Sequence, residues 1–193
     1  MNALLISINA KYIHTNNAVR LLKVNSDFDV DIKEYTIKDD IKEIIEYVNQ
    51  SHHNVIGFSV YIWNVEMIKT ILKKMIHENK TIILGGPEVS YEPKHFLDQY
   101  PVDFIIKGEG EIVFNQLLHH LNDQKMIENL PSIAYYDKNN FINHPIEEIT
   151  LLDQINPPYF LEADKPHIKD KIAYVEASRG CPYNCTYCLS SLE

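Results

Sequence analysis

The sequence predicts an α/β protein built on a flavodoxin-like, doubly wound parallel sheet of five strands. Short apolar runs, too short for helices, recur along residues 1–125, and stretches of helical periodicity separate them. This alternation is typical of parallel sheets, because each strand needs a crossover before the next one. A chain of 193 residues is long enough to bury such a core without disulfides.

The first two strands and helices are expected before residue 51. The run "ALLIS" fits a buried strand, and after the polar stretch "NAKYIHTNN" the run "AVRLLK" has the pattern of a helix. "DVDIKEYTI" alternates and is rich in β-branched residues, which predicts a strand. "DDIKEIIEYVNQ" spaces its apolar residues along one helix face, with Asp39 or Asp40 as the N-cap.

Three further strand–helix pairs follow. "NVIGFSV", "TIILGG" and "VDFIIKGEGE" predict buried strands, and "NVEMIKTILKKMIHENK", "EPKHFLDQY" and "EIVFNQLLHHLN" predict the helices after them. Asn64 is positioned to cap the first of these helices, and Pro93 lies in the first turn of the second. Five strands with right-handed crossovers favour the order 2-1-3-4-5. Residues 9–17, 59–64, 85–91 and 108–111 should then form loops at the carboxyl edge, where such sheets bind ligands.

The pattern changes after Asn122. "SIAYYDKNNFINH" predicts two short strands joined by a turn, and the proline-rich stretch after it predicts a linker. "IAYVEAS", residues 172–178, predicts one more strand. We therefore expect three parts: an α/β domain over residues 1–125, a hairpin and linker over 126–170, and the start of a second domain over 171–193.

Composition argues against several classes of protein. A net charge of -9 argues against a nucleic-acid partner, which would need a basic face. No run of apolar residues is long enough for a transmembrane helix, and the N-terminus lacks the basic region and cleavage site of a signal peptide. Three clustered cysteines are not a disulfide framework, so we expect a cytoplasmic protein without a membrane partner.

All three cysteines lie in "RGCPYNCTYC", at Cys181, Cys185 and Cys188. Thiolates at this spacing suit a metal centre, and the residues leave three possibilities open. His167 would complete a Cys₃His zinc site. A [4Fe–4S] cluster on three cysteines would keep one iron open for chemistry. The thiols would otherwise carry no metal.

The stretch "YVEASRGCPYNCTYC" resembles the CxxxCxΦC signature and lead-in of radical S-adenosylmethionine enzymes. The resemblance implies that Cys181, Cys185 and Cys188 hold a [4Fe–4S] cluster whose open iron binds S-adenosylmethionine. Tyr187 would then sit near the adenine. One-electron reduction by an electron donor would cleave S-adenosylmethionine to methionine and a 5′-deoxyadenosyl radical.

The N-terminal part resembles the cobalamin-binding domain that precedes the barrel in one class of these enzymes. "NVIGFSVY", "IILGGPEVS" and "VDFIIKGEGE" carry this resemblance. It implies a corrin over the carboxyl edge and a nucleotide tail between sheet and helices, with close approach at the glycines and a hydrogen bond from Ser59. Without the resemblance, the glycines are turn residues. The expected contacts are Asn9, His14, Ser59, Val60, Tyr61, Gly85, Gly86, Pro87, Gly108, Glu109 and Gly110.

His14 departs from the motif in which a histidine is the lower ligand of cobalt. Cobalamin domains of the methionine-synthase kind carry DxHxxG, whereas Tyr12 stands here at the aspartate position and Asn17 at the glycine position. The residue that would orient such a ligand is missing. His14 is thus either the lower ligand or a polar loop residue.

These features predict part of a cobalamin-dependent radical S-adenosylmethionine enzyme, a methyltransferase acting on an unactivated carbon of a small-molecule or peptide substrate. The barrel needs roughly another 200 residues, so we expect no turnover by this chain alone. A methylthiotransferase is rejected because residues 1–180 hold no cysteine for a second cluster. The alternative from another class is a non-catalytic ligand-binding or regulatory α/β module with a zinc tail.

Overall fold

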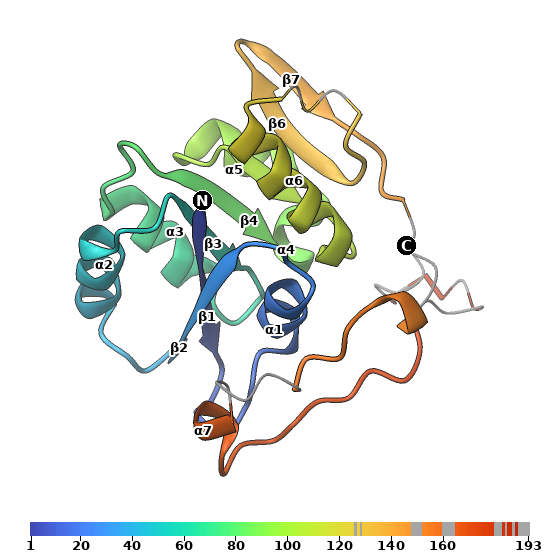
Figure 1. Cartoon of the computed structure of the whole chain (residues 1–193). Coiled ribbons are helices and arrows are strands. Elements are labelled where there is room, and N and C mark those ends of the chain that lie inside the picture. The colour runs from blue at the N-terminus through green and yellow to red at the C-terminus, as the bar shows by residue number, and fades with distance from the viewer. Residues whose placement is uncertain are drawn as a thin grey trace.

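The computed structural model describes residues 1–125, 127, 129–147, 152–159, 165–179, 183, 185, 186 and 188. Its centre is one mixed sheet with the strand order β2-β1-β3-β4-β5-β6-β7 (Figure 1). The parallel strands are β1 (Asn2–Asn9), β2 (Asp29–Thr36), β3 (Val55–Ser59), β4 (Thr81–Gly85) and β5 (Phe104–Ile106). The predicted order 2-1-3-4-5 is confirmed for these strands.

The predicted hairpin is confirmed, and it extends the same sheet instead of standing apart from it. β6 (Ile133–Asp137) pairs antiparallel with β5, and β7 (Asn140–Asn143) pairs antiparallel with β6. Lys107, which follows β5, is buried and donates from Nζ to Asn143 Oδ1 (2.6 Å) and to the His144 carbonyl. Backbone pairing and a buried ammonium group therefore both fasten the hairpin to β5.

Helices cover both faces of the parallel strands (Figure 1). In β1, Leu4, Ile6 and Ile8 enter one core cluster while Ala3 and Leu5 enter the other, since successive side chains point to opposite faces. The second face is covered by α1 (Asn17–Val24) and α6 (Glu111–Asp123), and the first by α2 (Ile41–Gln50), α3 (Val65–Lys74), α4 (Pro87–Ser90) and α5 (Pro93–Gln99). In the part of the chain that is described, no helix has the length and apolarity to cross a membrane.

The helix starts show which predicted caps form. Asp40 caps α2 by accepting from the Lys42 N–H (2.9 Å), whereas Asp39 accepts from the Thr36 N–H. Asn64 occupies the N-cap position of α3 without capping it through its side chain. Its Oδ1 accepts from the Tyr61 N–H (2.8 Å) and its Nδ2 donates to the Ile8 carbonyl (2.9 Å). Asn64 therefore joins the ends of β1 and β3 instead of closing a helix.

The segment after β7 returns along the carboxyl edge, past α1 (Figure 1, orange to red). We call residues 152–159 and 165–179 the C-terminal segment; it contains a 3₁₀ turn, η1 (Leu152–Gln154), and α7 (Lys165–Ile168). Of the predicted strand at 172–178, only Ile172 pairs, in a parallel bridge with His14. Pairing stops there because the partner chain turns into α1 at its cap, Asn16. The prediction of a strand is therefore wrong beyond Ile172.

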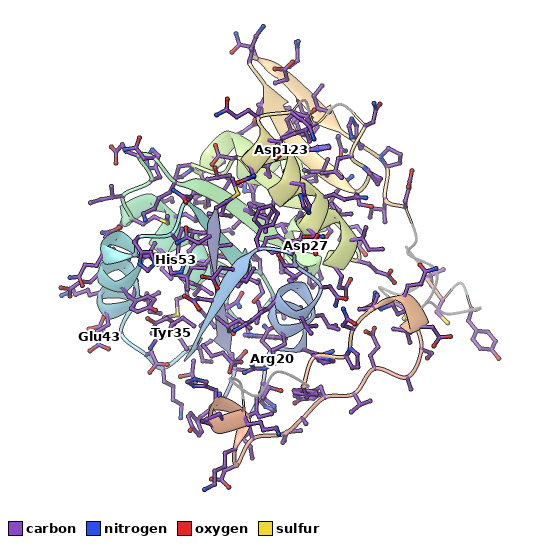
Figure 2. The ribbon with its side chains drawn as sticks, in the orientation of Figure 1. Arg20, Asp27, Tyr35, Glu43, His53 and Asp123 are labelled. Atoms are coloured by element: carbon purple, nitrogen blue, oxygen red, sulfur yellow. The ribbon has the colours of Figure 1, made fainter. Side chains whose placement is uncertain are left out.

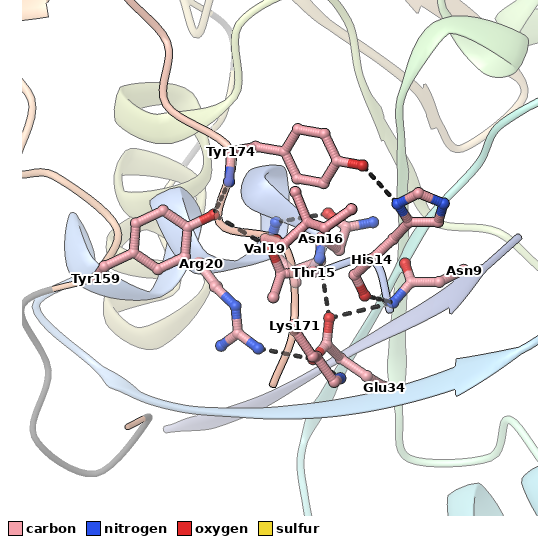
Figure 3. Close-up of polar contacts among 11 residues, drawn as sticks. Asn9, His14, Thr15, Asn16, Val19, Arg20, Glu34, Tyr159, Lys171 and Tyr174 are labelled. Atoms are coloured by element: carbon pink, nitrogen blue, oxygen red, sulfur yellow. Dashed lines mark hydrogen bonds and ion pairs between the residues drawn. The ribbon is translucent and has the colours of Figure 1, made fainter. Parts of the chain in front are cut away.

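The carboxylate of Glu34, on β2, holds four elements together (Figure 3). Its Oε1 accepts from the Asn16 N–H (2.9 Å) and Asn9 Nδ2 (3.2 Å), and its Oε2 accepts from Arg20 Nη2 (2.7 Å) and Lys171 Nζ (3.0 Å). The side chains of Arg20, Glu34 and Lys171 are 2%, 10% and 9% exposed. Arg20 reaches from α1 toward Glu34 (Figure 3), and the low exposure of all three side chains shields this group of charges from water.

Replacing Glu34 by glutamine should destabilise the fold. Arg20 and Lys171 would lose their shared counter-ion while remaining buried, and breaking such a pair from one side costs about 3 kcal/mol. The measurement is the free energy of unfolding in urea at neutral pH. The control is Glu78→Gln, because Glu78 is exposed in the loop before β4. Equal stability of the two variants would contradict a structural role for Glu34.

The contribution of Glu34 should also depend on pH. Burial raises the pKa of this carboxyl, but the Asn16 N–H, Arg20 and Lys171 together outweigh burial and leave the pKa below its ordinary value of 4.5. A carboxyl with a lowered pKa adds stability that is complete above the unfolded value and is lost as pH falls through the folded value. The difference in unfolding free energy between wild type and Glu34→Gln should therefore shrink below pH 4.5. A difference unchanged at about pH 3 would contradict this.

Candidate cofactor-binding site

A cavity of about 530 Å³ lies at the carboxyl edge, on the sheet face covered by α1 and α6. All four predicted loops contribute to it, the first of them through Asn17. Asn9, His14 and Val60 are outside its lining. The predicted contact residues that do line it are Ser59, Tyr61, Gly85, Gly86, Pro87, Gly108, Glu109 and Gly110.

The floor of the cavity is a groove in the sheet at Gly57, a residue that sequence analysis missed. Gly57 on β3 lies in register between Leu5 of β1 and Ile83 of β4, and all three line the cavity. A Cβ at Gly57 would come within 2.6 Å of Leu5 Cδ2, so the groove exists because position 57 has no side chain. A glycine inside a strand often marks a close approach of this kind, and that signal was available in "NVIGFSV".

The rim of the cavity depends on Gly86, between β4 and α4. Its φ of 110° is a conformation that residues with a side chain rarely adopt, and a Cβ would lie 2.5 Å from the Val60 carbonyl oxygen. The Val60 N–H in turn donates to the Gly85 carbonyl (2.7 Å). Val60, which is buried, therefore supports the glycine turn from behind and does not form the wall.

Polar groups stand at one end of the cavity, around the start of α1. Asn16 Nδ2 donates to Ser59 Oγ (3.1 Å) while its Oδ1 caps α1, so the position of Ser59 is tied to the helix. Burial raises the pKa of Tyr61, and a hydrogen bond with Asn16 offsets part of this effect. Asn17 Oδ1 is buried at the cavity wall and has no hydrogen-bond partner among the described residues. A buried acceptor in this state costs about 1–3 kcal/mol, so the site is incomplete without a donor.

The C-terminal segment closes another side of the cavity with Glu176, Ser178 and Arg179. Arg179 forms ion pairs with Glu109 (Nη1 to Oε2, 3.2 Å), Glu111 (Nη2 to Oε1) and Glu176 (Nη2 to Oε2, 2.9 Å). Burial lowers the pKa of the guanidinium, but the carboxylates outweigh burial and raise it above its ordinary value. We call these four residues the arginine clamp. The sequence motif indicated a role for the neighbouring cysteines, but it did not indicate that Arg179 pairs with these carboxylates.

His14 takes part in the packing of the C-terminal segment instead of lining the cavity (Figure 3). Its Nδ1 lies 2.5 Å from Tyr174 Oη, and its carbonyl accepts from Asn9 Nδ2 (3.1 Å). Thr15 Oγ1 beside it donates to the Ile172 carbonyl (2.8 Å). The predicted residues Asn9 and His14 are therefore engaged in the structure of their own loop.

Aromatic side chains flank the cavity on the β3–α3 loop. The rings of Tyr61 and Trp63 stack with centroids 4.5 Å apart and planes 5° from parallel. Trp63 Nε1 donates to the Ile8 carbonyl at the end of β1 (3.1 Å). Ile62 between them is 76% exposed, and Tyr12 on the neighbouring loop is 72% exposed. The carboxyl edge thus offers a partly apolar surface next to the cavity.

The predicted metal ligands are only partly within the described residues. Cys185 and Cys188 are half-buried, and the Cys188 N–H donates to the Cys185 carbonyl (3.0 Å). Cys181 and Tyr187 lie outside the described residues. His167 is exposed on α7. Within the described part of the chain, no three His, Cys, Asp or Glu side chains are grouped to hold a metal ion.

Two relatives resemble this chain in sequence. An uncharacterized methyltransferase of Pyrococcus horikoshii is 28% identical over 159 residues, which are 78% of this chain and 34% of that protein. The cobalamin-dependent radical SAM methyltransferase TokK of Streptomyces tokunonensis is 28% identical over 147 residues, covering 70% and 22% of the two chains. This chain therefore spans about a third or less of the relatives it matches.

A solved structure has the same fold. The cobalamin-dependent S-adenosylmethionine radical enzyme OxsB, with aqua-cobalamin and S-adenosylmethionine bound, superposes with a TM-score of 0.78 at 20% identity. The superposition covers 97% of this chain and 28% of OxsB. Residues 5–118, which contain the loops around the cavity up to α6, match the family described as B12 binding domain. The chain therefore belongs to the B12-binding domain family.

Proposed function

We propose that the chain is the cobalamin-binding part of a radical S-adenosylmethionine enzyme that methylates an unactivated carbon. The observation that carries the proposal is the cavity of about 530 Å³ with a glycine floor and rim, inside a B12-binding domain. Its volume lies within the range of about 300–1,000 Å³ of small-molecule sites. It suits the nucleotide tail of cobalamin, and the partly apolar surface of the edge loops is left for the corrin.

The residues of the cavity fit this ligand chemically. Gly57 leaves space above the sheet, where the flat base of the tail would pack against Leu5 and Ile83. Asn17 Oδ1 is an acceptor without a partner among the described residues, and a hydroxyl or amide of the ligand would donate to it. Ser59, held by Asn16, supplies a hydroxyl at the same end of the cavity.

Bound cobalamin would supply a methyl group on cobalt. The [4Fe–4S] cluster with S-adenosylmethionine would supply a 5′-deoxyadenosyl radical, which would take a hydrogen atom from the substrate carbon and so make that carbon able to accept the methyl group. In this proposal Cys181, Cys185 and Cys188 hold the cluster and Tyr187 packs near the adenine. The chain's described residues orient the tail and keep water from its base. A cytoplasmic location, an electron donor for the cluster and a small-molecule or peptide substrate complete the proposal.

Filling the cavity should weaken cobalamin binding without unfolding the protein. Gly85→Leu is the sharpest variant, because a Cβ at Gly85 would meet only the Ile106 carbonyl at an ordinary 3.6 Å. We expect wild type to retain hydroxocobalamin through gel filtration with a shifted spectrum, and Gly85→Leu to bind at least about tenfold more weakly, since its side chain occupies the cavity. Gln99→Leu, exposed at the end of α5, is the matched control.

Two results would count against the proposal. Equal binding by Gly85→Leu, shown folded by circular dichroism, would place the ligand outside the cavity. Failure of folded wild-type protein to retain hydroxocobalamin would contradict cobalamin binding by this chain.

Replacing His14 by alanine should leave the spectrum of bound hydroxocobalamin unchanged. His14 Nδ1 is engaged with Tyr174, and the residue lies outside the cavity lining. The absorption spectra of the two cobalamin-loaded proteins are compared at equal occupancy. A change in the variant that marks loss of a nitrogen ligand would identify His14 as the lower ligand of cobalt.

The cysteine motif should bind iron. Anaerobically purified protein is expected to hold about four iron and four sulfide per chain, and Cys188→Ser should lose most of both. Zinc is measured in the same samples. One zinc per wild-type chain without iron would contradict the cluster and support a zinc tail, in which thiolates and a histidine close the site.

A further inference from the structure

We propose that Glu111 is a positioning residue that holds Arg179, and with it the start of the cysteine motif, against the wall of the cavity. Through this contact, a ligand in the cavity and the position of the motif become linked. The link rests on the proposed function, because it requires that the cavity binds cobalamin. The clamp itself does not rest on it.

The arginine clamp is a buried contact, unlike ordinary surface ion pairs. The side chain of Arg179 is 13% exposed and that of Glu111 is 6% exposed. Arg179 donates to Glu111 from both Nη1 and Nη2, which is the two-point geometry that guanidinium groups make with carboxylates. Glu176, 36% exposed, lies at the rim. The two hydrogen bonds therefore fix the orientation of the guanidinium, and burial limits the screening of the ion pair by salt.

The two sides of the clamp differ in how they are held. Glu111 is the first residue of α6, whose Val113, Phe114 and Leu117 are buried in the core. Glu109 lies in the loop just before α6, next to Gly108, whose φ of 61° favours glycine. Arg179 comes from residues 173–179, which form no helix or strand. Glu109 and Glu111 are thus the fixed side, and the guanidinium of Arg179 is the side that they position.

The arginine clamp borders the cavity, and its arginine is the first residue of the cysteine motif. Glu109, Glu111, Glu176 and Arg179 all line the cavity, and Arg179 precedes Cys181 by two residues in the sequence. A ligand that fills the cavity would lie against the closed clamp and displace water from it, which strengthens its ion pairs. By linkage, a clamp that is stabilised by the ligand must in turn stabilise the bound ligand.

The chain offers a clean test of this contact. Its arginines are Arg20 and Arg179, and Arg20 is 1% exposed in α1. An arginine-specific protease can therefore cut the folded chain only after Arg179, once the guanidinium leaves its carboxylates. The measurement is the initial rate of cleavage to residues 1–179, followed by mass spectrometry, with and without hydroxocobalamin.

Glu111→Gln should be cut at least tenfold faster than wild type in the absence of cobalamin. Glu43→Gln is the matched control, because it also removes a carboxylate from the first turn of a helix, α2, but points into solvent (Figure 2). It should be cut at the wild-type rate. Saturating hydroxocobalamin should slow cleavage of wild type at least fivefold and slow Glu111→Gln by less, and the variant should bind cobalamin correspondingly more weakly.

The outcomes separate the clamp from the function. Wild-type cleavage rates in both Glu111→Gln and Glu109→Gln would overturn the clamp; the second variant serves if the first does not fold. Unchanged cleavage of wild type with bound hydroxocobalamin would overturn the link. If folded wild type does not bind hydroxocobalamin, the proposed function and the link fail together, whereas faster cleavage of Glu111→Gln still establishes the clamp.

Discussion

The buried carboxylate of Glu34 is where the parts of this molecule meet. It accepts from the backbone at the start of α1, from Arg20 within α1 and from Lys171 in the C-terminal segment. Asn16, whose N–H it holds, in turn caps α1 and contacts Ser59 at the cavity. The carboxylate of Glu34 on the edge strand β2 thereby fixes the β1–α1 loop, which lies outside the strands of the sheet. The site is built outward from this charge.

This arrangement explains the different fates of the residues in the β1–α1 loop. Asn9 contacts Glu34 and the His14 carbonyl, and His14 contacts Tyr174. These contacts commit both residues to the loop and to the C-terminal segment. Asn17, one residue past the cap, is turned to the cavity with its acceptor unsatisfied within the described residues. His14 and Asn17, three residues apart in the chain, thus differ in role: the first supports the loop and the second faces the cavity.

Local patterns were sufficient to predict the five parallel strands and the hairpin, but not that the hairpin extends their sheet. The apolar runs and helix periodicities give the parallel strands and helices, and "DKNN" marks the hairpin, because these signals arise from residues close in sequence. The strand order followed from the order that five-stranded doubly wound sheets favour. Glu34 and Lys171 are 137 residues apart, and nothing in either neighbourhood indicates the other. Gly57 was predicted only as part of a strand, and its role at the cavity floor was missed. Residues 172–178 have a strand pattern, yet a strand also needs a partner, and the β1–α1 loop supplies one only at Ile172.

The stacked pair Tyr61 and Trp63 has a spectroscopic consequence. Trp63 is the only tryptophan in the chain, so its indole emission comes from a single place, the β3–α3 loop beside the cavity. The indole is tied to β1 through the Ile8 carbonyl and stacked on a ring that lines the cavity. Because a corrin absorbs at wavelengths where indole emits, this protein carries a built-in fluorescent reporter whose quenching would register a corrin that arrives at the carboxyl edge.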